Sequence, residues 1–250
     1  MRVGLISDIH GNRIALDAVL AELRRDAPDL IVCLGDVAVG PQPRESLAAI
    51  RGLGCPVVLG NWDAAFIDGA VPAATNETAA IVNEIHRWWS DLIDDDDRAF
   101  LRSFVPQLEL DLDGVRALAF HGSPRSYDDW IFSTTPDDEL EPMFEPDRPP
   151  LLLGGHTHVQ LARRWHQSLI VNPGSVGLPF LDWWPKEVRV APWAEYAVVT
   201  ADRGSLQVDL RRAPFDVDAH LALARASGMP HAEWWIDCWL VEARAAGLAH

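Results

Sequence analysis

Cysteine, basic side chains and long apolar runs are all scarce in this chain of 250 residues. Its three cysteines, Cys33, Cys55 and Cys238, lie far apart without CxxC spacing, so neither a disulfide framework nor a zinc ribbon is indicated, and a reducing cytoplasm fits best. Lys and Arg number 21 against 37 Asp and Glu, and the net charge of -16 argues against a surface that neutralises the phosphates of a polynucleotide. No apolar run is long enough for a membrane span or a signal peptide, so we expect a cytoplasmic protein without a membrane anchor.

The first third of the chain alternates between predicted strands and predicted helices. Short apolar runs predict strands over residues 3–6, 30–34 and 56–59. Apolar residues at helical spacing predict a helix over 14–25, and Pro43 begins a second one. Helical crossovers between strands imply a parallel sheet, in which ligands bind beyond the carboxyl ends of the strands.

The rest of the chain is predicted to be helical at first and then largely antiparallel. A helix over 77–92 and a shorter one over 98–104 are separated by the acidic run 94–97, which is interpreted as a solvated helix terminus. Further strands and closing helices are predicted over residues 108–112, 115–120, 151–153, 161–165, 169–171, 196–200, 206–210, 216–227 and 232–246. Because there is no internal repeat or obvious linker, residues 1–250 are predicted to form one domain, with its C-terminal helices from about residue 216.

Five short stretches follow predicted strands and carry side chains that bind metal ions. They are Asp8-Ile9-His10, Gly35-Asp36, Gly60-Asn61, His121-Gly122 and Gly155-His156-Thr157-His158. Their carboxylate and amide oxygens and their imidazoles are the ligands that two divalent cations need when they share a carboxylate. Residues two apart in an extended chain point the same way, so Asp8 and His10 can reach one ion together, as can His156 and His158 if their segment stays extended. Each stretch alone is common, but their joint occurrence at strand ends predicts a dinuclear metal site.

The order Asp-x-His, Gly-Asp, Gly-Asn, His and Gly-His-x-His resembles that of the calcineurin-like metallophosphoesterase superfamily, over about residues 3–177. Residues 35–41, 121–124 and 172–177 are similar to its small bacterial and archaeal phosphodiesterase branch. The resemblance implies an α/β fold, a four-layer α/β/β/α sandwich of two mixed sheets with a dinuclear site between them. It also implies a division of the ligands: Asp8, His10 and His158 for the first ion, Asn61, His121 and His156 for the second, and Asp36 as the bridge.

The activity that the resemblance implies is hydrolysis of a small phosphodiester, nucleotide or aryl phosphate. Two cations about 3.5 to 4 Å apart can polarise a phosphoryl oxygen and hold a water molecule whose pKa is low enough to yield hydroxide, which attacks phosphorus in line with the leaving group. Asp36, Asn61 and His156 are the residues expected to be catalytic. Oxygen and imidazole ligands suit Mn, Fe, Zn, Ni or Mg, and manganese is the metal that we expect.

Trp62 departs from the family pattern, because many members have a histidine after the Gly-Asn pair. An indole N–H cannot serve as a general acid near neutral pH, so we expect leaving groups that need little protonation, such as those of aryl phosphates, or diesters rather than alkyl monoesters. The alternative is that Trp62 packs over the wall of the site. Asp63 is expected to orient its neighbours by hydrogen bonding. Weaker candidates for contact with the substrate or with the ligands are Arg13, Arg125 and Ser175.

The segment 178–193, with Trp183, Trp184 and Trp193, is more apolar than the family pattern leads us to expect. A loop packed on the sandwich or on a partner is favoured over a flap that stacks a substrate ring, because buried aromatic side chains usually serve cores and interfaces. A homo-oligomer is compatible with that interpretation. The histidines outside the five stretches, His86 among them, have no motif context and are expected to be structural or exposed.

Two other kinds of protein stay open. One is a scaffold without activity on the same fold, which the complete set of ligands argues against. The other is a metal-dependent regulator or binding module with little turnover, which the missing general acid keeps open.

Overall fold

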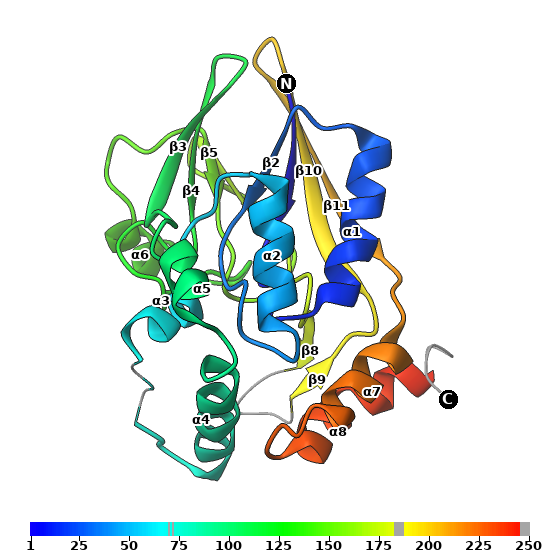
Figure 1. The fold of residues 1–250 in the computed structure, drawn as a ribbon. Coiled ribbons are helices and arrows are strands. Elements are labelled where there is room, and N and C mark those ends of the chain that lie inside the picture. Colours follow the sequence, from blue (N-terminus) through cyan, green and yellow to red (C-terminus); the bar gives the residue numbers. More distant parts are fainter. Residues whose placement is uncertain (70, 72, 183–187, 246–250) are drawn as a thin grey trace.

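Two mixed β-sheets form the centre of the computed structural model, which describes residues 1–69, 71, 73–182 and 188–245 (Figure 1). The first sheet has the strand order β11-β10-β1-β2, the second has the order β3-β4-β5-β7-β6, and a small third sheet pairs β8 with β9. The strands are β1 (Arg2–Ile6), β2 (Leu30–Cys33), β3 (Gln107–Leu112), β4 (Val115–Phe120), β5 (Leu151–Leu153), β6 (Leu161–Trp165), β7 (Ser168–Asn172), β8 (Phe180–Asp182), β9 (Arg189–Val190), β10 (Ala194–Asp202) and β11 (Ser205–Ala213).

The two large sheets pack against each other through an apolar layer. Leu5 of β1 and Leu34, which directly follows β2, belong to the first sheet. They lie in one buried cluster with Ala119 of β4 and Leu153 of β5 from the second sheet. In the first sheet β1 is parallel to β2 and antiparallel to β10. In the second, β4, β5 and β7 are parallel. The parallel strands β1, β2, β4 and β5 are the ones that lead into the predicted ligand segments.

Helices cover the outer faces of both sheets. The apolar faces of α1 (Arg13–Asp26) and α2 (Pro43–Leu53) pack on the first sheet, whereas only α6 (Asp137–Leu140) and the 3-10 helix η1 (Glu141–Met143) contribute to the cluster on the outside of the second. The remaining helices are α3 (Asn61–Asp68), α4 (Glu77–Ser90), α5 (Asp95–Leu101), α7 (Val217–Ala226) and α8 (Ala232–Ala245). The predicted four-layer α/β/β/α sandwich is confirmed, with a thin outer layer on the second sheet.

A separate group of elements gathers at one end of the sandwich. Figure 1 shows α4, α7, α8 and the β8–β9 hairpin at the end of the sheets away from the N-terminus. His231 at the start of α8 contacts Glu84 of α4, with 2.8 Å between Nε2 and Oε2. None of the helices in the described part of the chain combines the length and the apolar character needed to cross a membrane.

The structure differs from the predicted elements around residues 56–104. Residues 56–59 form isolated bridges, from Val57 to Cys33 and from Val58 to Val105, and no regular strand. Helix α3 was not predicted, because its first residues were assigned only to the ligand motif.

The acidic run 94–97 agrees with its interpretation as a solvated helix terminus at residues 94–96, which are exposed, but not at Asp97. It forms the N-cap and first turn of α5, which ends at Leu101. Asp97 is buried, and its carboxylate accepts a hydrogen bond from Nε of Arg44 at 3.1 Å. The interpretation was wrong for Asp97, because the guanidinium that compensates the buried charge comes from α2. Residue 246, the predicted end of the last helix, lies outside the described residues.

Candidate metal centre

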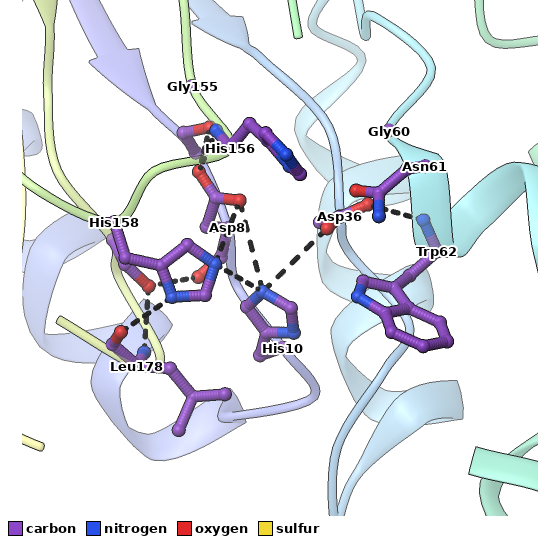
Figure 2. A network of polar contacts seen from close by, with 12 residues as sticks. Asp8, His10, Asp36, Gly60, Asn61, Trp62, Gly155, His156, His158 and Leu178 are labelled. Atoms are coloured by element: carbon purple, nitrogen blue, oxygen red, sulfur yellow. Dashed lines mark hydrogen bonds and ion pairs between the residues drawn. The ribbon is translucent and has the colours of Figure 1, made fainter. Parts of the chain in front are cut away.

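The seven predicted metal ligands meet beyond the carboxyl ends of the central strands, and Figure 2 shows six of them. Asp8 and His10 come directly after β1, Asp36 comes after β2 and His121 after β4, so their positions follow from the parallel pairing of these strands. Asn61 and His156 are half-buried. The fully buried side chains are those of Asp8, His10, Asp36, His121 and His158.

Five of these residues adopt the left-handed backbone conformation that favours glycine. Their φ angles lie between 46° and 70°, at Asp8, His10, Asp36, His156 and His158. The extended conformation assumed for Asp8-Ile9-His10 was therefore wrong, and the condition set for the histidine pair is not met, because the chain turns sharply at each ligand. Such a conformation costs about 1–3 kcal/mol for a residue other than glycine and persists where the surroundings enforce it. Here the backbone N–H of Asp8 donates to Gly35 O at 2.9 Å, and that of His10 donates to Asp36 O at 3.0 Å.

The Asp8 carboxylate has one oxygen that is bonded and one that is free. Oδ2 accepts hydrogen bonds from Ser7 Oγ at 2.6 Å and from the backbone N–H of His156 at 3.0 Å. Oδ1 is buried without a hydrogen-bond partner and lies 3.2 Å from Nε2 of His158 and 3.8 Å from Nε2 of His10. An unpartnered carboxylate oxygen that faces imidazole nitrogens is the arrangement that a bound cation would satisfy.

His10 and His158 point their ring nitrogens at each other, with 2.9 Å between the two Nε2 atoms (Figure 2). His158 Nδ1 lies 2.7 Å from Leu178 O, and because a carbonyl oxygen only accepts, this nitrogen carries the proton. The Nε2 atom of His158 is therefore the ring nitrogen that faces His10 and Asp8. When it is deprotonated, such a nitrogen offers the lone pair with which histidine binds a metal ion.

His121 repeats the arrangement on the other side of the site. Its Nδ1 lies 2.7 Å from Leu34 O and carries the proton. Its Nε2 lies 3.1 Å from Asn61 Oδ1 and 3.4 Å from Asp36 Oδ2. A divalent cation bound among these three atoms would take the place of the proton that the carboxylates favour on Nε2 of His121.

The charges in the site shift the pKa values of its residues in opposite directions. Burial opposes ionisation of Asp8, but the facing imidazoles, His158 first, outweigh it and hold the pKa of Asp8 well below its ordinary value. Burial likewise lowers the pKa of His121, but Asp36 and Asp8 outweigh it and raise that pKa to about 10. Burial, together with His121, lowers the pKa of His156 to about 4, so this ring is neutral near pH 7. The carboxylates of Asp8 and Asp36 thus favour positive charge among the imidazole rings of the site.

Two groups of ligand atoms lie close enough together to hold a metal ion each. Within each group the ligand atoms all lie within 4.8 Å of one another; the first group is Asp8, His10 and His158, and the second is Asp8, Asp36 and His121. The Asp36 carboxylate lies between the groups, with Oδ2 at 3.8 Å from His10 Nε2 and at 3.4 Å from His121 Nε2. His156 Nε2 is a further buried nitrogen without a hydrogen-bond partner, and its ring centroid lies 5.1 Å from that of His121. The residues present therefore fit a pair of divalent cations.

Asp63 holds the loop that carries Asp36. Its Oδ1 accepts from the backbone N–H of Val37 at 3.0 Å and of Ala38 at 3.4 Å, and its Oδ2 accepts from Gly60 at 3.4 Å. Burial raises the pKa of Asp63 to about 7, and the nearby Asp36 adds to the rise. Asp63 thus contacts backbone on both sides of Asp36.

The weaker sequence candidates lie around the site rather than in it. Ser175 is buried, and its hydroxyl donates to Asp8 O at 2.7 Å, so it supports the ligand loop. Arg13 pairs with Asp17, with 2.9 Å between Nε and Oδ1, and Arg125 pairs with Asp129, with 2.7 Å between Nε and Oδ2. Both guanidinium groups are held by carboxylates of their own segments.

Two aromatic rings outside the ligand motifs contact candidate ligands, and Trp62 contacts Asp36 through its backbone. Phe180 stacks on the His158 ring at 4.4 Å between centroids, and Trp130 meets the His156 ring edge-on at 5.4 Å. The backbone N–H of Trp62 donates to Asp36 Oδ1 at 3.0 Å, while its indole ring meets His86 of α4 edge-on. The motif analysis missed Trp130 and the position of His86. The sequence signal for His86 was its place one turn before Trp89 on an apolar helix face.

The described part of the segment 178–193 packs on the sandwich, as the favoured interpretation expects, with Leu178, Phe180 and Val188 against the core. Phe180 reaches a candidate ligand, whereas Trp193 packs away from the site, donating to Glu195 Oε1 at 3.1 Å and lying under the Arg212 guanidinium. Trp183 and Trp184 lie outside the described residues.

Comparison with known proteins identifies the family of the chain. The sequence profile of the calcineurin-like phosphoesterase superfamily domain matches residues 1–202. An uncharacterised protein of Methanocaldococcus jannaschii is 28% identical over 193 residues, which cover 71% of this chain and 76% of the relative.

Two solved structures share the fold over nearly the whole chain. The crystal structure of a metallophosphoesterase from Sphaerobacter thermophilus is 28% identical, covers 94% of this chain and 97% of its own, and superposes with a TM-score of 0.72. That of a hypothetical protein from Pyrococcus horikoshii is 23% identical, covers 94% and 96% of the two chains, and has a TM-score of 0.75. The chain belongs to the calcineurin-like phosphoesterase superfamily.

Proposed function

We propose that this protein is a dinuclear metal-dependent phosphoesterase that hydrolyses a small phosphodiester, nucleotide or aryl phosphate. The observation that carries the proposal is the pair of ligand groups, in which carboxylate oxygens and imidazole nitrogens converge, together with Asp8 Oδ1 and His156 Nε2, which are buried without hydrogen-bond partners. Asp8, His10 and His158 would hold one ion and Asn61, His121 and His156 the other, with Asp36 shared. Manganese is the metal that we expect, and Fe, Zn, Ni and Mg are alternatives.

The residues of the chain have distinct tasks in such a reaction. When bound, two divalent cations polarise a phosphoryl oxygen and lower the pKa of a water molecule so that hydroxide forms near neutral pH. Leu34 O and Leu178 O accept from Nδ1 of His121 and His158, which orients Nε2 of both rings toward the site. The backbone N–H of Trp62 orients the Asp36 carboxylate.

The leaving group receives no proton from residue 62. Its indole ring packs against His86, and an indole N–H does not ionise near neutral pH. We therefore expect diesters and aryl esters to react faster than alkyl monoesters, whose leaving alkoxide needs a general acid. Equal rates on alkyl and aryl monophosphates would contradict this preference.

The test is manganese-dependent turnover of bis(p-nitrophenyl) phosphate by the purified chain and by Asp36→Ala and His156→Ala. Each substitution is expected to lower kcat/KM by about 100-fold or more, because it removes an expected ligand. Asp138→Asn, at an exposed carboxylate on α6, is the matched control. Metal content and thermal unfolding are measured on the same samples. A folded, metal-loaded protein without turnover on monoesters, diesters and nucleotides would favour a binding or regulatory role instead.

A further inference from the structure

An apolar cavity of about 250 Å³ adjoins the candidate metal centre. His10, Asp36, His156 and His158 form one side of it, and the other sides come from α4, α8 and the β8–β9 region. These elements meet at the same end of the sandwich in Figure 1. The cavity is therefore continuous with the place where a phosphoryl group would bind.

Large rings dominate the remaining walls of the cavity. They include Trp62, Trp89, Trp130, Phe180, Trp235 and Trp239. Among the described residues that line it, and apart from the four candidate ligands, the titratable side chains are the imidazole of His86 and the thiol of Cys238. Burial lowers the pKa of His86 to about 3, so this ring is neutral near pH 7.

A wall of this kind discriminates between the groups that a phosphate ester can carry. A ribose or a charged substituent loses hydrogen bonds to water on entry, and a cavity without compensating polar groups makes that loss expensive. An aromatic or branched aliphatic group loses little and gains contact with the rings. An apolar cavity of about 150 Å³ is known to hold one benzene molecule, so 250 Å³ suits a group of one or two rings.

We propose that this cavity binds the apolar ester group of the substrate, an aromatic or compact aliphatic alcohol of one to two rings joined to the phosphate that the metal centre would cleave. This inference rests on the proposed function and selects among its substrates, since it places aryl phosphates above nucleotides. A larger cavity of about 410 Å³, lined by Arg116, Arg125 and Arg148, includes none of the candidate ligands and would not bring an ester to them.

The first experiment compares phenyl, 2-naphthyl and adenosine esters, each as the monophosphate and as its methyl diester. Phenol and naphthol are leaving groups of similar acidity, so a difference between their esters reports contact with the cavity. We expect kcat/KM for the naphthyl ester to exceed that for the phenyl ester by about tenfold, and the adenosine ester to be the poorest of the three.

Two variants narrow the cavity from opposite helices. Val82→Phe on α4 and Cys238→Phe on α8 change half-buried wall residues that are not candidate ligands. Each is expected to bring the naphthyl-to-phenyl ratio of kcat/KM close to one. Leu223→Phe, at an exposed position of α7, adds the same ring elsewhere and should leave the ratio unchanged.

A binding measurement without phosphate or metal gives an independent result. 2-Naphthol is expected to quench the tryptophan fluorescence of the metal-free protein, and the narrowing variants should weaken its binding about tenfold relative to Leu223→Phe. Turnover with no naphthyl preference and no effect of the narrowing variants would overturn the inference while leaving the phosphoesterase proposal standing. No turnover on any ester would overturn that proposal instead, and the naphthol measurement would still show whether the cavity takes an apolar group.

Discussion

Two glycines determine how closely the loops of the candidate metal centre approach each other. Gly35 has a φ of 102°, and a Cβ atom there would lie 2.7 Å from Gly60 N. A Cβ atom on Gly60 would lie only 2.0 Å from Asp36 Oδ1. Since contacts this short do not occur between unbonded atoms, any side chain at position 60 must displace the Asp36 carboxylate.

Gly60→Ala is therefore expected to weaken manganese binding by about 10- to 100-fold, because it moves the Asp36 carboxylate, whose Oδ2 lies 3.4 Å from His121 Nε2 and 3.8 Å from His10 Nε2. Gly52→Ala is the matched control, since a Cβ atom on Gly52 of α2 meets nothing within 4 Å. That control should leave metal binding unchanged and stabilise the fold by about 0.5–1 kcal/mol, as Gly to Ala does within a helix. Calorimetric titration with Mn²⁺ and urea unfolding measure both effects. Equal affinity in the two variants would contradict the role assigned to Gly60.

The identity of the candidate ligands could be inferred from the sequence, but their conformation could not. Residue type and order placed Asp8, Asp36 and His121 after strands, and the structure brings them together. The left-handed turns at these positions depend on hydrogen bonds between separate loops, which no local pattern encodes. The contact of His86 with Trp62 also arises only from tertiary packing.

The packing of helix α7 against helix α8 encloses a histidine. His220 of α7 is fully buried among the rings of Phe215, Trp235 and Trp239, and neither ring nitrogen has a hydrogen-bond partner. Burial lowers the pKa of His220 to about 3. Because this is below the value in the unfolded chain, the unfolded state binds the proton first and stability is lost as the pH falls below about 6.5.

His220→Phe is expected to remove this contribution. Below pH 6.5 the buried His220 costs the unmodified chain about 1.4 kcal/mol of unfolding free energy for each pH unit. Between pH 7.5 and pH 5 the unfolding free energy of the variant should therefore rise by about 2 kcal/mol relative to that of the unmodified chain. Urea unfolding at the two pH values measures the change. Leu223→Gln on the exposed face of the same helix should keep the pH dependence of the unmodified chain. A variant that loses stability with acid as steeply as the unmodified chain would show that His220 is not the group responsible.

Elements with strong local signals were predictable, whereas those stabilised by distant partners were not. The hairpin of β3 and β4 around Asp113-Gly114 agrees with its prediction, because turn residues and apolar alternation both specify it. The sequence of residues 56–59 predicted a strand, but in the structure Val57 and Val58 pair only through single bridges. The burial of Asp97 depends on Arg44, which lies on another helix and could not be assigned to it from the sequence.

For the whole molecule, the candidate metal centre joins the two sheets. Asp8 and Asp36 follow strands of the first sheet, while His121 and the histidines after β5 follow strands of the second. Bound cations would therefore connect two layers that otherwise meet through apolar contacts.

Removal of metal with EDTA is expected to lower the thermal unfolding midpoint by about 5–10 °C, since a ligand at 100 times its dissociation constant contributes about 2.7 kcal/mol. Asp36→Ala should show a smaller difference between the loaded and the EDTA-treated protein, because it binds the ions less tightly. Scanning calorimetry with and without Mn²⁺ measures both. Identical midpoints for the unmodified chain under the two conditions would contradict a metal centre that links the sheets.

The rings of His10 and His158 meet although 148 residues separate them along the chain. Contacts of such long range form only after the intervening chain has collapsed, since closing a large loop costs entropy before any contact compensates for it. The complete ligand set thus does not exist during early folding. In a refolding experiment, manganese capture would be a late kinetic event, with a rate set by the docking of the two sheets and not by the concentration of the ion.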